Sequence, residues 1–292
     1  MIAYFILVHR YPEQFKRMFR AIYQPTNHYL VHIDKNSGTH IAKDIEAFLE
    51  PYQNAEILGA QRALWGGYSL VEAQLRGMQR LLATNADWTH FINLSGQDFP
   101  LKSQVYIGDF LKRNYGKEFI RVLDQTAVRP DTLNRIKHIC IEMFGCIFRT
   151  SISRKFLKGA TPYIGTQWMI VSRPFCEFVC NAPEAKRFKR FYRNSFIADE
   201  SFFQTVMMNG VPHGRIVPDD LRMIDWIPDG NIKLRPRTFN LKDAAILTAT
   251  SNLFARKFDL THDSKIIDLL EQHIQLPAIT AGMALQTELA AA

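Results

Sequence analysis

Long apolar runs and paired cysteines are both missing from this chain of 292 residues. The apolar run that begins at Ile2 is too short to cross a membrane, so we expect no transmembrane segment. The four cysteines form no C-x-x-C pair and are too few for a disulfide scaffold. Two of them, Cys176 and Cys180, stand four apart in an expected helix, where we interpret them as small core residues. Internal repeats and low-complexity linkers are absent too, which leaves an ordinary folded protein.

Acidic residues are outnumbered by basic ones. Lys and Arg number 36 against 28 Asp and Glu, which gives a formal charge of +8. Such a balance favours an anionic partner: nucleic acid, a membrane surface or the phosphates of a small molecule. Because the basic residues are spread out and form no block with interleaved aromatics, we expect no nucleic acid. The charge allows peripheral contact with an anionic membrane, and the oligomeric state is left open.

Strands and helices alternate in the first hundred residues. Continuous apolar runs predict strands at Ile2–Val8, Tyr29–Ile33, Ala55–Leu58 and Phe91–Leu94. Apolar residues at helical spacing lie between these runs, from Pro12 to Ile22, from Ile41 to Leu49 and from Val71 to Leu82. The order predicts an α/β fold with a mixed, mainly parallel sheet and helices on both faces.

The second half of the chain is less periodic. A strand is expected at Trp168–Ser172, and helices are expected at Pro174–Cys180, Arg187–Arg193, Leu241–Leu247 and Ser264–His273. The stretch from Asp124 to Thr161 is interpreted as irregular, and its basic residues, Arg135 among them, as a solvated face. The stretch from Lys233 to Arg237 is interpreted as an irregular basic piece.

Acidic residues follow two of the expected strands. In open α/β sheets, ligands bind beyond the carboxyl ends of the strands, where Asp34 and Asp98 are expected. Asp34 is placed either to accept a hydrogen bond from a uracil or ribose group or to cap its own turn. Asp98, in the sequence SGQDFP, either points into the cleft or only forms the turn.

Two carboxylates open the stretch IADESFFQTVMMNG, residues 197–210. Asp199 and Glu200 stand at the start of an apolar helical run in which Phe203, Val206 and Met207 share a face. One interpretation is helix capping, because acidic side chains in a first turn favour the helix dipole. The other is catalysis, because a carboxylate on a rigid helix start makes a well-held general base.

Seven segments spread over the chain resemble glycosyltransferase family 14, which contains the core 2/I-branching β-1,6-N-acetylglucosaminyltransferases and the peptide O-xylosyltransferases. They are AYFILVHR, RAIYQPTNHYLVHIDKNS, LWGGYSLVEA, FINLSGQDFPLK, IGTQWMIVSR, ADESFF and LFARKFD, in the order of the family. The resemblance is weakest from Asp124 to Thr161, where we expect acceptor specificity to lie.

The resemblance implies a GT-A-like, Rossmann-type sheet in one catalytic domain of residues 1–292. Within it, residues 1–123 would be the nucleotide-binding half and residues 124–292 the acceptor and catalytic half. The absence of an anchor suggests a bacterial-type member in the cytoplasm, peripheral at the inner membrane and active in polysaccharide biosynthesis.

The resemblance also implies a set of site residues. Glu200 falls on the catalytic base of the family, and Leu7 and Asp34 fall where the uracil and ribose of UDP are held. Lys257, with Arg235 or Arg237, falls on the cations that contact the diphosphate. Trp65 and Asp98 are assigned to the donor pocket, although Trp65 is equally interpretable as a packing aromatic beside a tight turn. Arg256 and Lys257 are alternatively a solvated pair on a loop, an interpretation that the flanking LFA and FD disfavour. The xylosyltransferases carry an acidic residue where this chain has Gln167, which leaves Glu200 as the sole candidate base.

No Asp-x-Asp motif, the usual metal-holding motif of nucleotide-sugar enzymes, occurs in the chain. We therefore expect an inverting, metal-independent transferase without a cofactor, in which fixed cations stabilise the leaving diphosphate. The donor is expected to be a UDP-sugar, with GlcNAc favoured over xylose, and the acceptor a glycan hydroxyl. Two alternatives stay open: a non-catalytic carbohydrate-binding protein and a sugar-nucleotide pyrophosphorylase. The latter is disfavoured because HRYPEQ, after the first strand, is not a Gly-rich loop.

Overall fold

The computed structural model describes residues 1–59, 61–84, 86–229 and 233–275. These residues form two compact units whose segments alternate along the chain. The first unit contains Met1–Pro12, Pro25–Gly96 and Asn114–Asp220. The second contains Glu13–Gln24, Gln97–Arg113 and the described residues from Leu221 onward. The division into a nucleotide-binding half, residues 1–123, and an acceptor and catalytic half, residues 124–292, does not refer to these units and stays a prediction.

A seven-stranded sheet in the order β12-β6-β11-β4-β1-β2-β3 runs through the first unit. Its strands are β1 (Ile2–Val8), β2 (His28–Ile33), β3 (Ala55–Leu58), β4 (His90–Ser95), β6 (Lys117–Ile120), β11 (Met169–Ser172) and β12 (Arg215–Val217). Strand β11 is antiparallel to both β4 and β6, and every other neighbouring pair is parallel. The predicted mixed, mainly parallel sheet is therefore confirmed.

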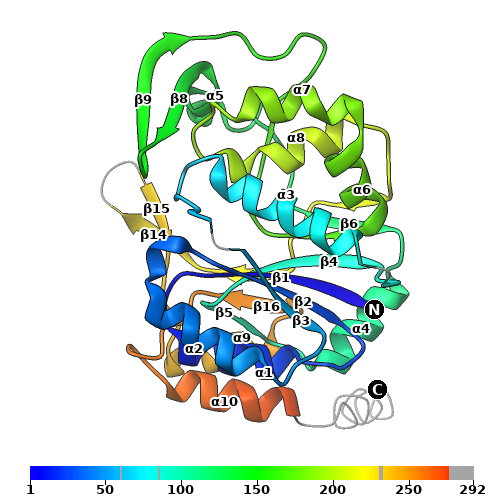
Figure 1. The fold of residues 1–292 in the computed structure, drawn as a ribbon, viewed down its shortest axis with the longest axis vertical. Helices are drawn as coiled ribbons and strands as arrows, with labels where there is room; N and C mark the ends of the chain where they lie inside the picture. The colour runs from blue at the N-terminus through cyan, green and yellow to red at the C-terminus, as the bar shows by residue number, and fades with distance from the viewer. Residues whose placement is uncertain (60, 85, 230–232, 276–292) are drawn as a thin grey trace, which may run out of the picture. The chain divides into compact units, whose positions relative to one another are not determined.

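The central strands are buried on both faces of the sheet, which explains why their sequences are continuous apolar runs. All seven residues of β1 are buried, and so are all six of β4, because helices cover the sheet. On one face, α3 (Ser69–Leu82) and α6 (Arg173–Asn181) pack against the strands, and α2 (Thr39–Leu49) lies on the other (Figure 1). Helix α3 approaches β1 closely, since a Cβ at Gly77 would lie 2.5 Å from the ring of Phe5. The expected flanking helices are thus present.

Helix α6 also confirms the interpretation of two cysteines. Cys176 and Cys180 are buried in its core-facing side, and burial raises the pKa of Cys180 to about 11. Helix α7 (Pro183–Tyr192) follows directly and begins four residues before the predicted start at Arg187. Helix α8 (Phe202–Asn209) packs against it, and Phe202 and Phe203 add to the aromatic core.

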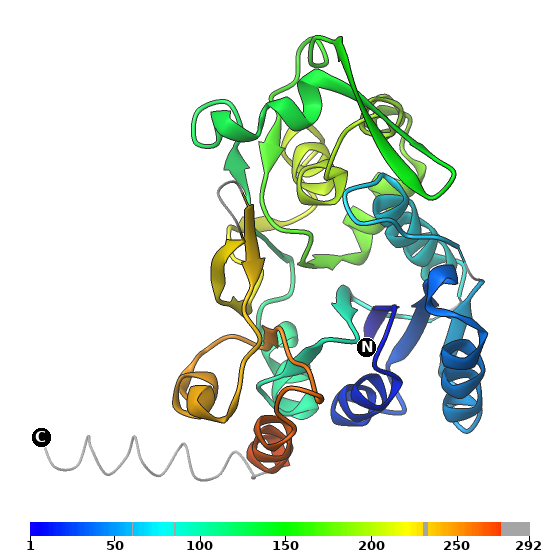
Figure 2. The same cartoon turned by 90° about the vertical axis from the view of Figure 1, so that its left-hand side faces the viewer.

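The stretch from Asp124 to Thr161 is more regular than its sequence indicated. After β7 (Leu123–Asp124), η2 (Pro130–Thr132) and α5 (Asn134–Lys137), it forms a hairpin of β8 (His138–Met143) and β9 (Cys146–Ser153). Figures 1 and 2 show this hairpin as a long twisted ribbon. Its turn, Phe144-Gly145, has positive φ at both residues, 53° and 78°, as two-residue hairpin turns require. The short strand β10 (Tyr163–Ile164) then pairs with β7.

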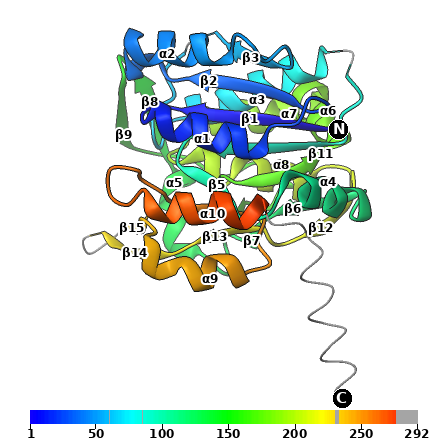
Figure 3. The ribbon, with the colours of Figure 1, turned by 90° about the horizontal axis from the view of Figure 1, so that it is seen from below.

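The second unit contains a three-stranded sheet, β13-β16-β5, formed by Arg222–Ile224, Phe254–Arg256 and Asp98–Pro100. A hairpin of β14 (Trp226–Asp229) and β15 (Lys233–Pro236) shows that the piece predicted to be irregular is a strand, because it finds an antiparallel partner. The second unit also contains four helices: α1 (Pro12–Ile22) except for its first residue, α4 (Gln104–Arg113), α9 (Ala244–Ala249) and α10 (Lys265–Gln275). Figure 3 shows α9 beside α10. Each helix in the described part of the chain is too short or too polar to span a bilayer.

Candidate functional site

The stretch around Glu200 is a turn followed by a helix. Ala198–Glu200 form a 3-10 turn, η3, and α8 starts only at Phe202. The predicted single helical run from Asp199 is therefore wrong: Ile197 has a left-handed φ of 49°, and the φ of Ser201 is −140°. The N–H of Ile197 donates to the carbonyl of Gly66 over 2.8 Å and holds the turn in place. The two carboxylates thus precede α8 rather than cap its first turn.

Glu200 lies in a position that is both accessible and fixed. Its side chain is 30% exposed, and its Oε2 accepts a 2.6 Å hydrogen bond from Nη1 of Arg135. Its backbone carbonyl accepts from the N–H of Gly165 over 2.8 Å. Arg135 was predicted to belong to a solvated basic face, and the ion pair corrects that interpretation. This ion pair fixes the orientation of the carboxylate while part of it stays accessible.

Asp199 has the opposite environment. Its side chain is buried, and burial first, then the charge of Glu200, raises the pKa of Asp199 to about 7. One of its carboxylate oxygens, Oδ1, has no hydrogen-bond partner among the described residues. The Glu200 carboxylate, by contrast, is partly exposed and paired with Arg135. Of the two, Glu200 is therefore the better placed to act as a base.

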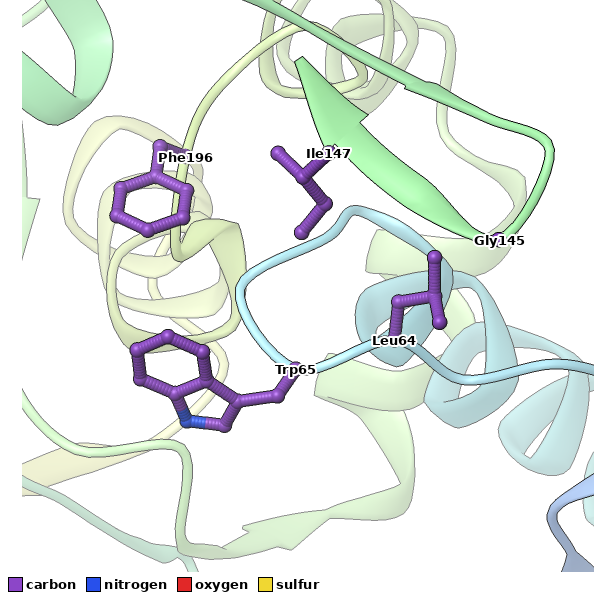
Figure 4. Close-up of a pocket in the computed structure, with 5 residues that line it drawn as sticks. All are labelled: Leu64, Trp65, Gly145, Ile147 and Phe196. Carbon is purple, nitrogen blue, oxygen red and sulfur yellow. The ribbon is translucent and has the colours of Figure 1, made fainter. Parts of the chain in front are cut away.

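A shallow apolar pocket of about 300 Å³ lies in the first unit. Figure 4 shows the side chains that line it. It is lined by Leu64, Trp65, Gly145, Ile147 and Phe196. The Trp65 and Phe196 rings meet edge to face, with centroids 6.1 Å apart, and Trp65 is 67% exposed. A residue larger than glycine at position 66 would place its Cβ 2.8 Å from the Phe196 ring, so the glycine permits this contact. Its φ of 79° is a second reason for glycine.

The pocket and Glu200 are connected through the backbone. Phe196 stands two residues before the η3 turn, and its N–H donates to the carbonyl of Arg135 over 2.8 Å. Arg135 in turn holds the Glu200 carboxylate. An accessible aromatic surface, suited to the apolar face of a sugar ring, is therefore built on the same short segments as the candidate base.

Asp34 caps the turn that follows β2. Its Oδ1 accepts from the N–H of Asn36 over 2.7 Å, and its Oδ2 accepts from the N–H of Ala63 over 2.9 Å. Both oxygens retain capacity for a further donor, since a carboxylate has about four acceptor sites. Leu7 lies in β1 opposite His32 and is almost completely buried. Contact of Leu7 and Asp34 with a nucleotide stays a prediction.

Asp98, in the second unit, belongs to a buried cluster of charges. Its side chain is fully buried, and Oδ1 accepts a 2.7 Å hydrogen bond from Nη1 of Arg256. Nε of Arg222, also fully buried, lies 4.0 Å from Oδ2. Because buried charges are costly unless paired, this arrangement explains why the carboxylate is held between two guanidinium groups. Contact of Asp98 with a donor sugar stays a prediction.

Lys257 follows β16 and lies between Phe254 and Phe258, which are both fully buried as expected. Its backbone N–H donates to the carbonyl of Arg237 over 3.4 Å, and its carbonyl accepts from Phe239 over 2.9 Å. Of the two candidate arginines, Arg237 is therefore the one whose backbone lies beside Lys257.

The two arginines differ in their surroundings. Arg237 donates to Asp225 over 2.6 Å and to Asp243 over 2.8 and 2.9 Å, and these carboxylates raise the pKa of Arg237. The Arg235 side chain is 55% exposed and lies 3.9 Å from Asp229.

The predicted site residues divide between the two units. Leu7, Asp34, Trp65 and Glu200 belong to the first unit, and Asp98, Arg235, Arg237 and Lys257 belong to the second. Within the ranges that the structure describes, no three His, Cys, Asp or Glu side chains are grouped as metal ligands would be. Arg135 and Phe196 are the site residues that the sequence did not indicate, since nothing in their local patterns points to Glu200.

Comparison with known proteins gives a family and several relatives. A family model described as Branch: Core-2/I-Branching enzyme matches residues 2–251. Xylosyltransferase 2 of Rattus norvegicus is 28% identical over 294 residues, which cover 94% of this chain and 33% of that protein. Xylosyltransferase 1 of the same organism is 28% identical over 302 residues, with coverages of 97% and 36%. The chain thus spans about a third of the length of these relatives.

Among solved structures, the galactosyltransferase LgtC, in complex with donor and acceptor sugar analogues, matches over 97% of this chain and 99% of its own. The sequence identity is 8% and the TM-score is 0.44.

Proposed function

Because the chain belongs to the Core-2/I-Branching enzyme family, we propose that it is an inverting glycosyltransferase. It transfers a sugar from a UDP-sugar to a hydroxyl group of a glycan acceptor. The observation that carries this proposal is the Glu200 carboxylate, which is accessible, paired with Arg135 and built on the same segments as the aromatic pocket.

Inversion needs one base on the acceptor side of the sugar. Glu200 accepts the proton of the acceptor hydroxyl, the hydroxyl oxygen forms a bond to the anomeric carbon, and the bond from that carbon to the diphosphate breaks. UDP leaves with the electron pair of the broken bond. Asp199 is less suited to this role because it is buried and its raised pKa favours the protonated form.

The departing diphosphate needs positive charge as it develops. Lys257 is the proposed cation, because the buried neighbours Phe254 and Phe258 fix its backbone. One arginine of the β15 segment assists: Arg235 has the more exposed side chain, whereas Arg237 is adjacent to the Lys257 backbone. These cations take the place of a divalent metal, so neither a metal nor a cofactor is required in the proposed reaction.

For the donor sugar we favour GlcNAc, with xylose as the second candidate. The similar proteins named above are xylosyltransferases by name, which supports xylose. Gln167 supports the other choice, because the corresponding position is acidic in the xylosyltransferases that the sequence resembles. Its backbone carbonyl is held by Nδ2 of Asn93 over 2.7 Å, so the segment is fixed in place.

Release of UDP from a panel of UDP-sugars tests the proposal. A transferase releases UDP from one preferred donor, slowly in water and faster with a glycan acceptor. A carbohydrate-binding protein releases none, and a pyrophosphorylase releases UTP when pyrophosphate is added.

Glu200→Gln should lower turnover by about 10²- to 10⁴-fold, the usual cost of losing a general base, with UDP binding retained. Glu184→Gln is the matched control: it makes the same substitution at an exposed residue of α7 and should leave turnover unchanged. Normal turnover in Glu200→Gln would disprove the role of Glu200.

A further inference from the structure

The β8–β9 hairpin, residues 138–153, presents large apolar side chains to solvent. Cross-strand pairing places Ile141 opposite Phe148 and Met143 opposite Cys146 on one face. The exposed apolar side chains of the hairpin are Ile141 (40%), Met143 (47%), Phe144 (84%), Phe148 (49%) and Ile152 (59%). Because side chains alternate along a strand, Cys146 and Phe148 share this outer face of β9 up to the irregular pairing that follows Arg149.

The opposite face of the hairpin already has its packing partners. The carboxylate of Glu142 accepts from the N–H of Ser69 over 3.0 Å, and the Arg149 guanidinium lies 4.8 Å from the centre of the Phe196 ring. At the base, Arg154 donates to the carbonyls of Ile136, Phe191 and Asn194. The hairpin is therefore anchored through its inner face, and its apolar outer face plays no part in that anchoring.

The charges around this face have one sign. Residues 134–161 contain six Lys and Arg but a single acidic residue, Glu142, which faces inward. Two of the six, Arg135 and Arg154, are engaged in the contacts described above. Lys137, Lys155 and Lys158 are exposed, and Arg149 is exposed as well but lies over the Phe196 ring on the inner face. An apolar outer face with cations at the base of the hairpin matches the interface of an anionic bilayer, where acyl chains take the apolar groups and headgroups take the charge.

We propose that the β8–β9 hairpin docks the protein on an anionic lipid membrane, with Phe144 and Met143 entering the headgroup region. The charge pattern disfavours a second copy as the occupant, because pairing two such hairpins would bring both sets of cations together. The proposal is independent of the reaction assigned to Glu200. It holds equally for a protein without transferase activity.

Cys146 supplies a reporter for this surface. It is exposed on the outer face of the hairpin, whereas Cys140, Cys176 and Cys180 are buried. A polarity-sensitive fluorophore attached to Cys146 should shift to shorter wavelength with vesicles of phosphatidylglycerol and phosphatidylcholine. Vesicles of phosphatidylcholine alone should give little shift, and added salt should reverse it, since headgroup attraction is screened.

A double substitution tests the apolar tip. Met143→Ser combined with Phe144→Asn should reduce partitioning into anionic vesicles at least about tenfold, because burial of one large apolar side chain contributes roughly 1.5–3 kcal/mol. Asparagine is chosen at position 144 because it tolerates the positive φ found there. Tyr115→Ser, which removes another exposed aromatic, should leave partitioning unchanged. Transfer to a soluble acceptor should be normal in both variants.

Three results would overturn the proposal. The first is an unchanged fluorescence spectrum of labelled protein with anionic vesicles. The second is full binding by the double variant with its circular dichroism intact. The third is a shift that appears without vesicles, grows with protein concentration and accompanies a dimer in sedimentation, which would assign the face to a second copy.

Discussion

Arg135 donates a 2.6 Å hydrogen bond to Glu200, which lies 65 residues later in the chain. The partners come from different elements, α5 and η3, so the ion pair depends on the fold of the stretch that was predicted to be irregular. It holds the carboxylate in one orientation, as the proposed role of Glu200 as a general base requires.

Replacing Arg135 with glutamine should lower kcat by about tenfold to a hundredfold, because hydrogen bonds to charged groups contribute about 1.5–3 kcal/mol. The expected readout is steady-state transfer with the preferred UDP-sugar. Arg190→Gln removes one positive charge from the exposed face of α7 and serves as the control. If both variants turn over alike, Arg135 has no particular role in the reaction.

Asp199 should make stability depend on pH. Its pKa rises from 3.8 to about 7 on folding, so the folded state holds a proton that the unfolded chain has released between these values. Stability should therefore fall as the pH rises from about 4 to about 7, with a slope of at most about 1.4 kcal/mol per pH unit. Asp199→Asn should remove this slope in urea unfolding measured at several pH values.

Asp131→Asn is the control for this experiment. The side-chain hydrogen bond from Arg129 lowers the pKa of Asp131, so its contribution changes only at more acidic pH. Between pH 5 and 8 the curve of this variant should run parallel to that of the wild type. Parallel curves for Asp199→Asn as well would show that Asp199 does not titrate in this range.

Lys257→Ala should reduce kcat more than it weakens donor binding, because the charge on the diphosphate develops in the transition state. The loss of one such donor costs roughly 2.7–4 kcal/mol in comparable oxyanion sites, which is about 10²- to 10³-fold in rate. Lys242→Ala, an exposed lysine of the same unit, should behave as the wild type. Wild-type kinetics in Lys257→Ala would show that Lys257 does not stabilise the diphosphate.

The two arginines can be separated by measuring stability together with rate. Arg237→Ala breaks the pairs with Asp225 and Asp243 and should lower Tm whatever its catalytic role. Arg235→Ala removes a mostly exposed side chain and should leave Tm unchanged. A loss of kcat in Arg235→Ala at unchanged Tm would assign the diphosphate contact to Arg235. Normal kcat in that variant would shift the assignment to Arg237.

Chelation tests the proposed metal independence. Activity should persist after treatment with EDTA and respond little to added Mn²⁺ or Mg²⁺, since fixed cations are proposed to stabilise the leaving group. A protein dialysed against buffer without EDTA is the control. Loss of turnover on chelation that Mn²⁺ restores would show that a carboxylate of this chain does hold a metal.

Elements with a continuous buried side were predictable from sequence. The strands β1 and β2 and the helix α10 carry their pattern within a few residues, so burial and periodicity locate them. The β8–β9 hairpin was not predicted because its outer face is apolar although it is exposed, which conceals the alternation expected of a half-buried strand. Its turn, Phe144-Gly145, also lacks the usual Asn or Asp at the first position.

The candidate site was only partly predictable for a related reason. Glu200 stands in a recognisable motif, whereas its partner Arg135 is fixed by tertiary contacts alone. The break between η3 and α8 depends on the left-handed conformation of Ile197, and a β-branched residue gives no sequence signal for positive φ.

The alternation of the two units along the chain limits how this protein can be recombined with others. Since Glu13–Gln24 and Gln97–Arg113 belong to the second unit, no single crossover point exchanges one unit whole. A chimera that takes only the residues after Asp220 from a relative combines one parent's α1, α4 and β5 with the other parent's β16 and α10. Such hybrids must re-form the pairing of β5 with β16, including the contact of Asp98 with Arg256, across two sequences. Residues 124–161, where acceptor specificity is predicted to lie, belong to one continuous segment of the first unit and can be exchanged without dividing the second unit between two parents.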